Sequence, residues 1–199
     1  MVARFGAFAP TRRILRLAGS ILAGLLILTP AAALGHQNYS LAPNGVSPFI
    51  YSNPFTVCGN WYGENTHRDL VNGVHYNEHF AVDLCPTGGA FGKALYPIWN
   101  GLRVTYVGAS EGRLDMVGTI GGQQHRLRYR HMDRIFVSVG QSVGTSTVVG
   151  TLGSRGNSTG PHLHMSAHVH GSDGLYYSRP LLICGRQIPH NHTAVYSSC

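Results

Sequence analysis

Charged residues are scarce in this sequence: Asp, Glu, Lys and Arg together make up 12% of the 199 residues. Long surface helices need more charge than this, whereas 26 glycines and 10 tyrosines suit short strands joined by tight turns. Disorder is disfavoured too, because the 43% hydrophobic residues are ample for the core of one globular domain. The composition therefore predicts a mostly β protein, a small antiparallel β-sheet domain with few short helices.

Acidic residues are missing from the first 60 positions, and all eight lie beyond them. Four of the 15 basic residues, by contrast, fall within the first 16 positions. Without that segment 11 basic and 8 acidic residues remain, so the net charge drops from +7 to +3. Such a mild charge leaves no electrostatic footprint for nucleic acid, and we expect no nucleic-acid partner.

The apolar run at residues 17–28 is shorter than the roughly 18 to 20 apolar residues that span a bilayer. It follows an arginine-bearing start and precedes Ala31-Ala32-Ala33, which fits a signal-peptidase site. We therefore expect residues 1–33 to be a cleaved signal peptide and the mature protein to be secreted or periplasmic, with no membrane attachment. An uncleaved anchor is the alternative. The Arg12-Arg13 pair leaves both general and twin-arginine export open.

Closely spaced cysteine pairs are absent as well, since the four cysteines are at least 15 positions apart. Their spacing excludes a zinc finger of the usual kind, which needs pairs such as C-x-x-C. An even number of cysteines in an exported protein predicts two disulfides. Three pairings are open, and we favour Cys58 with Cys85 and Cys184 with Cys199. The first would tie an N-terminal segment to the following strand, and the second would pin the C-terminal tail.

Short apolar runs with alternation begin near residue 80 and predict strands at residues 102–107, 114–120, 127–129, 135–139, 148–152 and 163–169. Gly121-Gly122 between two of these runs predicts a tight hairpin, because glycine tolerates the positive φ angles of its turn. We expect an antiparallel meander in a main domain of residues 58–183. An extended segment, residues 34–57, precedes this domain, and a disulfide-pinned tail, residues 184–199, follows it.

Some of the 12 histidines are spaced to share a site. His162 and His164 are two apart at the start of a predicted strand, which puts both side chains on one face. His79 and Asp83 are four apart and share a face in either a strand or a helix. Two imidazoles and a carboxylate suit catalytic Zn²⁺, because three protein ligands leave one tetrahedral position for the water that the metal activates. A single H-x-H pair arises often by chance in a histidine-rich chain, so the assignment depends on further elements.

Three elements occur in order: His79-x-x-x-Asp83, Tyr129-Arg130-His131-Met132 and Gly160-Pro161-His162-Leu163-His164. With Val139-Gly140-Gln141 between the last two, the chain from about residue 73 to 171 resembles the M23 zinc peptidases of the lysostaphin and LytM types. The resemblance implies a groove in which His79, Asp83 and His164 bind zinc while His131 and His162 act as unligated catalytic histidines. Ala81 stands where the commoner family pattern has glycine. The residues around His131 also resemble the β-lytic branch, whose first two ligands are more widely spaced, so the subfamily stays open.

The resemblance implies a secreted zinc metalloendopeptidase that hydrolyses the stem or cross-bridge peptides of bacterial peptidoglycan, and we expect a monomer. Two alternatives remain: an inactive relative that binds the wall or activates another hydrolase, and a general secreted metalloprotease. The complete set of five histidine and aspartate positions favours an active enzyme. His67, His75 and His168 belong to no motif and are expected at surface or packing positions. The bond that is cut stays open.

Overall fold

The computed structural model describes residues 40–49, 54–59, 68–71, 74–78, 80–188 and 195–196. These residues form strands, turns and loops, and the few short helices expected from the sequence are not found among them. The fold of the described part is therefore all β, as the glycine-rich, charge-poor composition predicts. The expected signal peptide, residues 1–33, lies outside this part, and within it no helix could cross a membrane.

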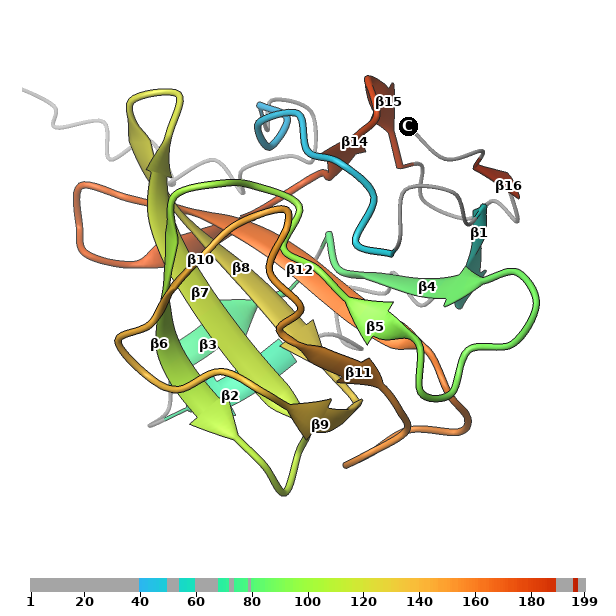
Figure 1. Cartoon of the computed structure of the whole chain (residues 1–199). Helices are drawn as coiled ribbons and strands as arrows, with labels where there is room; N and C mark the ends of the chain where they lie inside the picture. The colour runs from blue at the N-terminus through green and yellow to red at the C-terminus, as the bar shows by residue number, and fades with distance from the viewer. Residues whose placement is uncertain are drawn as a thin grey trace, which may run out of the picture. The chain divides into compact units, whose positions relative to one another are not determined.

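A nine-stranded sheet organises the domain. Its strands are β1 (Phe55–Gly59), β4 (Val82–Pro86), β6 (Leu102–Gly108), β7 (Arg113–Ile120), β8 (Gln123–Arg130), β10 (Ser142–Val143), β12 (Leu163–His170), β13 (Tyr176–Arg179) and β16 (Val195–Tyr196). The order is β10-β6-β7-β8-β12-β4-β1-β16, and β13 pairs with the second half of β12 (Figure 1). Every pairing in this sheet is antiparallel. Strand β12 lies between β8 and β4.

Smaller sheets lie beside the large one. A three-stranded sheet contains β5 (Ala94–Leu95), β11 (Gly150–Leu152) and β9 (Met132–Ile135), and there are two hairpins, β2 (Arg68–Val71) with β3 (Val74–Asn77) and β14 (Leu182–Ile183) with β15 (Arg186–Gln187). In Figure 1 the three-stranded sheet lies in front of the large sheet and the β2–β3 hairpin lies behind it. The three-stranded sheet shares the hydrophobic core with the large sheet, and β3 contacts β13.

Most of the strands predicted from alternation are present. The β7–β8 hairpin turns at Gly121 and Gly122, whose φ angles are 60° and 83°, so the turn prediction is confirmed. The prediction of a strand at 135–139 is wrong beyond Ile135. Phe136 and Val139 are exposed, at 55% and 63% of their surface, and form a loop. The strand was predicted because these two residues are apolar, like the residues of a buried strand. The predicted strand at 148–152 is also shorter, because pairing begins at Gly150.

The central strand β12 is buried on both faces, and the two faces differ in chemistry. Leu163, Met165 and Ala167 are fully buried in the apolar core. Burial of a side chain as large as leucine or methionine contributes about 1.5 to 3 kcal/mol to stability. His164 and Ser166 point to the opposite face and are buried as well. A buried polar layer under the sheet needs partners, and these make up the candidate site.

One disulfide joins β1 to β4 through Cys58 and Cys85, 27 residues apart, with their Cα atoms separated by 5.7 Å. This confirms the first predicted pairing. Cys184 is also disulfide-bonded, but its predicted partner, Cys199, lies outside the described residues. The observed disulfide fixes β4 two residues after Asp83.

Candidate active site

Asp83 and His164 meet across two neighbouring strands. β4 and β12 pair with Asp83 directly opposite His164, so both side chains point to the same face of the sheet. His164 Nδ1 lies 2.9 Å from Asp83 Oδ1, although 81 residues separate the two in the sequence. The pair therefore depends on the register of these two strands.

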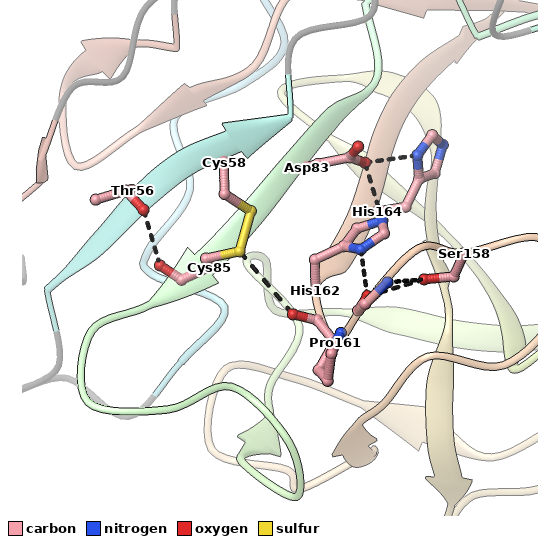
Figure 2. The surroundings of a disulfide bond; sticks show 9 residues. Thr56, Cys58, Asp83, Cys85, Ser158, Pro161, His162 and His164 are labelled. Atoms are coloured by element: carbon pink, nitrogen blue, oxygen red, sulfur yellow. Dashed lines mark hydrogen bonds and ion pairs between the residues drawn. A yellow bond between two sulfur atoms is a disulfide. The ribbon is translucent and has the colours of Figure 1, made fainter.

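His162 lies just before β12, and its ring joins this pair (Figure 2). Its Nε2 is 3.5 Å from Asp83 Oδ1. Its Nδ1 is 2.8 Å from the carbonyl oxygen of Gly160, and a carbonyl only accepts, so Nδ1 carries a proton. The Ser158 hydroxyl donates to the same carbonyl at 2.9 Å and holds the loop. In the neutral ring Nε2 is the unprotonated nitrogen, and it faces Asp83.

His131 lies at the corner between β8 and β9, where its φ of 63° is one that few residues other than glycine adopt. Its Nδ1 donates to the carbonyl oxygen of Arg155 at 2.7 Å. The ring centroid is 4.7 Å from that of His162 and 5.7 Å from that of His164. Burial lowers the pKa of His131 to about 4, so the ring is neutral at pH 7 and Nε2 is a hydrogen-bond acceptor.

The backbone around His131 is held in this unusual conformation by its neighbours. Met132 N–H donates to the carbonyl oxygen of Gly112 at 3.1 Å. A Cβ at Gly112 would lie 2.3 Å from the Met132 carbonyl oxygen, so only glycine allows this approach. Arg155, whose carbonyl receives the His131 proton, also lies 3.6 Å from the Asp133 carboxylate. These contacts connect the loops that carry His131 and His162.

The structure thus brings together four of the five predicted site residues: Asp83, His131, His162 and His164. His79, the third predicted ligand, lies outside the described residues, and within the described part no group of three metal-ligating side chains is found. The chemistry of the donors nevertheless fits zinc, because an imidazole nitrogen and a carboxylate oxygen face one another at 2.9 Å. On either side of position 79, Glu78 and Phe80 are buried.

Glu78 is a site residue that the sequence reasoning missed. It is 3% exposed, and its Oε2 lies 3.2 Å from His164 Nε2. Burial opposes the charged form of His164, but the hydrogen bonds to Asp83 and Glu78 outweigh it and raise the pKa of His164 to about 9. The only available signal was an acid next to His79, and many surface acids have such a position.

Among the histidines without a motif, His168 is fully buried, as a packing residue would be. Within the described part neither of its ring nitrogens has a hydrogen-bond partner. Burial, reinforced by the charge of Arg126, holds its pKa well below 6.5. His67 and the side chain of His75 lie outside the described part of the chain.

Comparison with known proteins points to one family. Residues 88–174 match the model of Peptidase family M23, a segment that contains His131, His162 and His164 and begins after Asp83. Lysostaphin from Staphylococcus simulans is 32% identical over 110 residues, which are 54% of this chain and 21% of that protein. An uncharacterized metalloprotease from Haemophilus influenzae is 33% identical over 69 residues, 35% of this chain and 14% of that protein. The chain thus spans about a fifth or less of the length of these relatives.

Solved structures of the same kind are similar to this chain. The catalytic domain of the antimicrobial peptidase lysostaphin from Staphylococcus simulans is 27% identical, with a TM-score of 0.43 over 60% of this chain and 87% of that chain. A zinc-containing peptidase from Vibrio cholerae is 21% identical, with a TM-score of 0.44 over 67% of this chain and 39% of that chain. Over residues 88–174 the chain is similar to peptidase family M23.

Proposed function

We propose that this protein is an exported zinc metalloendopeptidase that hydrolyses peptide bonds in bacterial peptidoglycan. The observation that carries the proposal is the convergence of Asp83, His131, His162 and His164 from separate elements onto one place. Non-catalytic relatives of a hydrolase have no need for such a set. Similarity to the M23 family over residues 88–174 supports the reaction class, and the motif resemblance supports the substrate class.

Asp83 and His164 would hold the metal, together with His79. Asp83 offers Oδ1 and His164 offers Nδ1, which already face each other. When bound, zinc would act as a Lewis acid on the scissile carbonyl and lower the pKa of its bound water to about 7. Three protein ligands leave a coordination position open, as in catalytic rather than structural zinc sites.

The two other histidines would move protons. His131 and His162 each donate Nδ1–H to a backbone carbonyl, which orients the ring and leaves Nε2 as the basic nitrogen. His162 Nε2 lies beside Asp83, so it can accept the proton of an attacking water and return it to the leaving amine. His131 is kept neutral by burial, and its ring lies beside that of His162, where it would assist.

A cleavage assay tests this proposal. Purified mature protein, loaded with zinc, is incubated with peptidoglycan sacculi or with casein, and the His131→Ala protein serves as the matched control. We expect soluble muropeptides with new amino termini from sacculi and little release from casein, with mass spectrometry identifying the bond. Binding to sacculi without release of fragments would favour an inactive wall-binding protein. Equal cleavage of casein would favour a general metalloprotease.

Export is a separate part of the proposal. The arginine-bearing start, the apolar run at residues 17–28 and the alanines before position 34 support a signal peptide. Sequencing the amino terminus of the protein recovered from the culture medium or periplasm tests it. We expect the mature chain to begin near residue 34, and recovery of the intact chain in the membrane fraction would contradict export by cleavage.

A further inference from the structure

Glu78 is a buried carboxylate whose two oxygens have different partners. It lies between β3 and β4 and is 3% exposed. Its Oε1 accepts from Arg128 Nη1 at 2.8 Å and from the Ser166 hydroxyl at 3.1 Å. Its Oε2 lies 3.2 Å from His164 Nε2. One oxygen is therefore fixed by the sheet, and the other is directed at the imidazole of a candidate metal ligand.

The ring of His164 lies between two carboxylates. Nδ1 faces Asp83 at 2.9 Å and Nε2 faces Glu78 at 3.2 Å. A neutral imidazole has one proton, and only the nitrogen without it can bind a metal. Without metal both carboxylates can accept a proton from the ring. When Asp83 is a metal ligand, only Glu78 remains to accept a proton, at Nε2, which leaves the Nδ1 lone pair for the metal. We propose that Glu78 is a positioning residue that keeps the proton of His164 on Nε2, so that Nδ1 is the nitrogen that binds zinc.

The surroundings of Glu78 fix its position. The side chain of Arg128 is 1% exposed and forms an ion pair with Glu78. It also donates two hydrogen bonds to Asp115, from Nε to Oδ1 at 2.8 Å and from Nη2 to Oδ2 at 3.0 Å. Asp115 is bonded in turn by Arg113 at 2.8 Å. Buried charges of this kind are tolerated only when paired and hydrogen-bonded. The ion pairs extend over β7 and β8 and end at the carboxylate that faces His164.

Partners of this kind are known to tune metal sites in general: a carboxylate that accepts the second N–H of a ligating histidine fixes its tautomer and raises its basicity, and its loss weakens metal binding about 10- to 100-fold. Asp115 provides a matched control within the same ion-pair chain. It is buried and bonded to Arg128 like Glu78, and its carboxylate accepts hydrogen bonds from Arg113 and Arg128. Loss of Asp115 disturbs the packing of Arg128 without removing the carboxylate at Nε2.

Zinc affinity, measured by competition with a chromophoric chelator, is the first test, and the inference rests on the proposed function. We expect Glu78→Gln to bind zinc about 10- to 100-fold more weakly than the unaltered protein. Asp115→Asn should stay within about twofold, since it does not touch the ligand. Equal losses in the two variants, or no loss in Glu78→Gln, would overturn the inference. Failure of the unaltered protein to bind zinc would refute the proposed function instead.

A second measurement needs only the unaltered protein, so it holds even if a variant fails to fold. Long-range ¹H–¹⁵N correlation NMR of histidine-labelled protein, with and without zinc, reports which ring nitrogen carries the proton. Without zinc we expect both ring nitrogens of His164 to carry protons at neutral pH, because each faces a carboxylate. With zinc we expect only Nε2 to keep its proton, with the Nδ1 resonance displaced by the metal. Protonation at Nδ1 with Nε2 displaced by zinc would overturn the role of Glu78, whether or not the protein cleaves peptidoglycan.

Discussion

His164 and His168 allow a direct comparison of two regions on one strand. Both lie on β12, four residues apart on the same face of the sheet, and both are buried. His164 lies between Asp83 and Glu78, and its pKa is raised to about 9. His168 lies opposite Arg126 on β8, and its pKa is held well below 6.5, first by burial and then by that charge.

The difference teaches that carboxylates, and not the histidine or its burial, distinguish a candidate ligand from a packing residue on this strand. Burial alone lowers the pKa of an imidazole, and both residues are subject to it. At the start of β12, strand pairing with β4 places Asp83 beside His164, and the segment before β4 places Glu78 there. A substitution of His164 should therefore abolish zinc binding, and a substitution of His168 should not. Both should weaken the packing of β12.

The largest expected effect separates the two histidines directly. His164→Ala should lose both zinc and activity, because three protein ligands leave none in reserve, and Asp83→Ala and His79→Ala should behave alike. His168→Ala should be less stable but keep its zinc. Metal content by mass spectrometry and turnover on sacculi measure the two effects. Full zinc occupancy in folded His164→Ala would contradict the assignment.

Next in size are the two histidines that are not expected to bind metal. His131→Ala and His162→Ala should retain zinc but lose about 10²- to 10⁴-fold in turnover, the usual contribution of a positioned acid or base. The same zinc and sacculus assays apply, with His168→Ala as the control for loss of a buried imidazole. A metal-free but correctly folded His162→Ala protein would show that a ligand had been mistaken for a catalyst.

Removal of the β1–β4 disulfide should have a smaller effect. A bridge that closes a loop of 27 residues contributes about 3 kcal/mol to the free energy of unfolding. Cys58→Ser with Cys85→Ser should lower stability by about that amount and also weaken zinc retention, because Cys85 is two residues from Asp83. Cys184→Ser should affect stability without affecting zinc. Chemical denaturation and zinc competition measure both, and equal zinc loss in the two proteins would contradict this.

The smallest effect concerns pH and His168. The pKa of His168 in the folded protein is below the ordinary value of 6.5. At a pH between the folded and the unfolded pKa, the unfolded chain therefore binds a proton at His168 that the folded protein does not bind. Stability therefore falls as pH drops below 6.5, by at most about 1.4 kcal/mol per pH unit for one such proton. His168→Gln should show a shallower loss than the unaltered protein in urea titrations between pH 5 and pH 7. Identical slopes would show that His168 titrates normally.

Sequence reasoning predicted the β class, the Gly121-Gly122 hairpin and the first disulfide because each depends on local chemistry or simple spacing. It also predicted that His162 and His164 share a site, because an H-x-H pattern at the start of a strand puts both side chains on one face. The H-x-x-x-D pattern stays a prediction, because His79 lies outside the described residues. Glu78 could not be found in this way: its partners Arg128 and His164 are 50 and 86 residues away. The strand predicted at 135–139 is wrong beyond Ile135, because exposed and buried apolar side chains look alike in a sequence.

The pairing of Asp83 with His164 also bears on how the protein matures. In a β-ladder, a slip of one residue turns every side chain to the other face, so the two groups face each other in only one register of β4 against β12. Contacts 81 residues apart in the sequence form late, because a long loop must close first. A chain that is still folding therefore offers no preformed metal site. Zinc uptake would report that the central strands have aligned, and it would discriminate against misregistered protein.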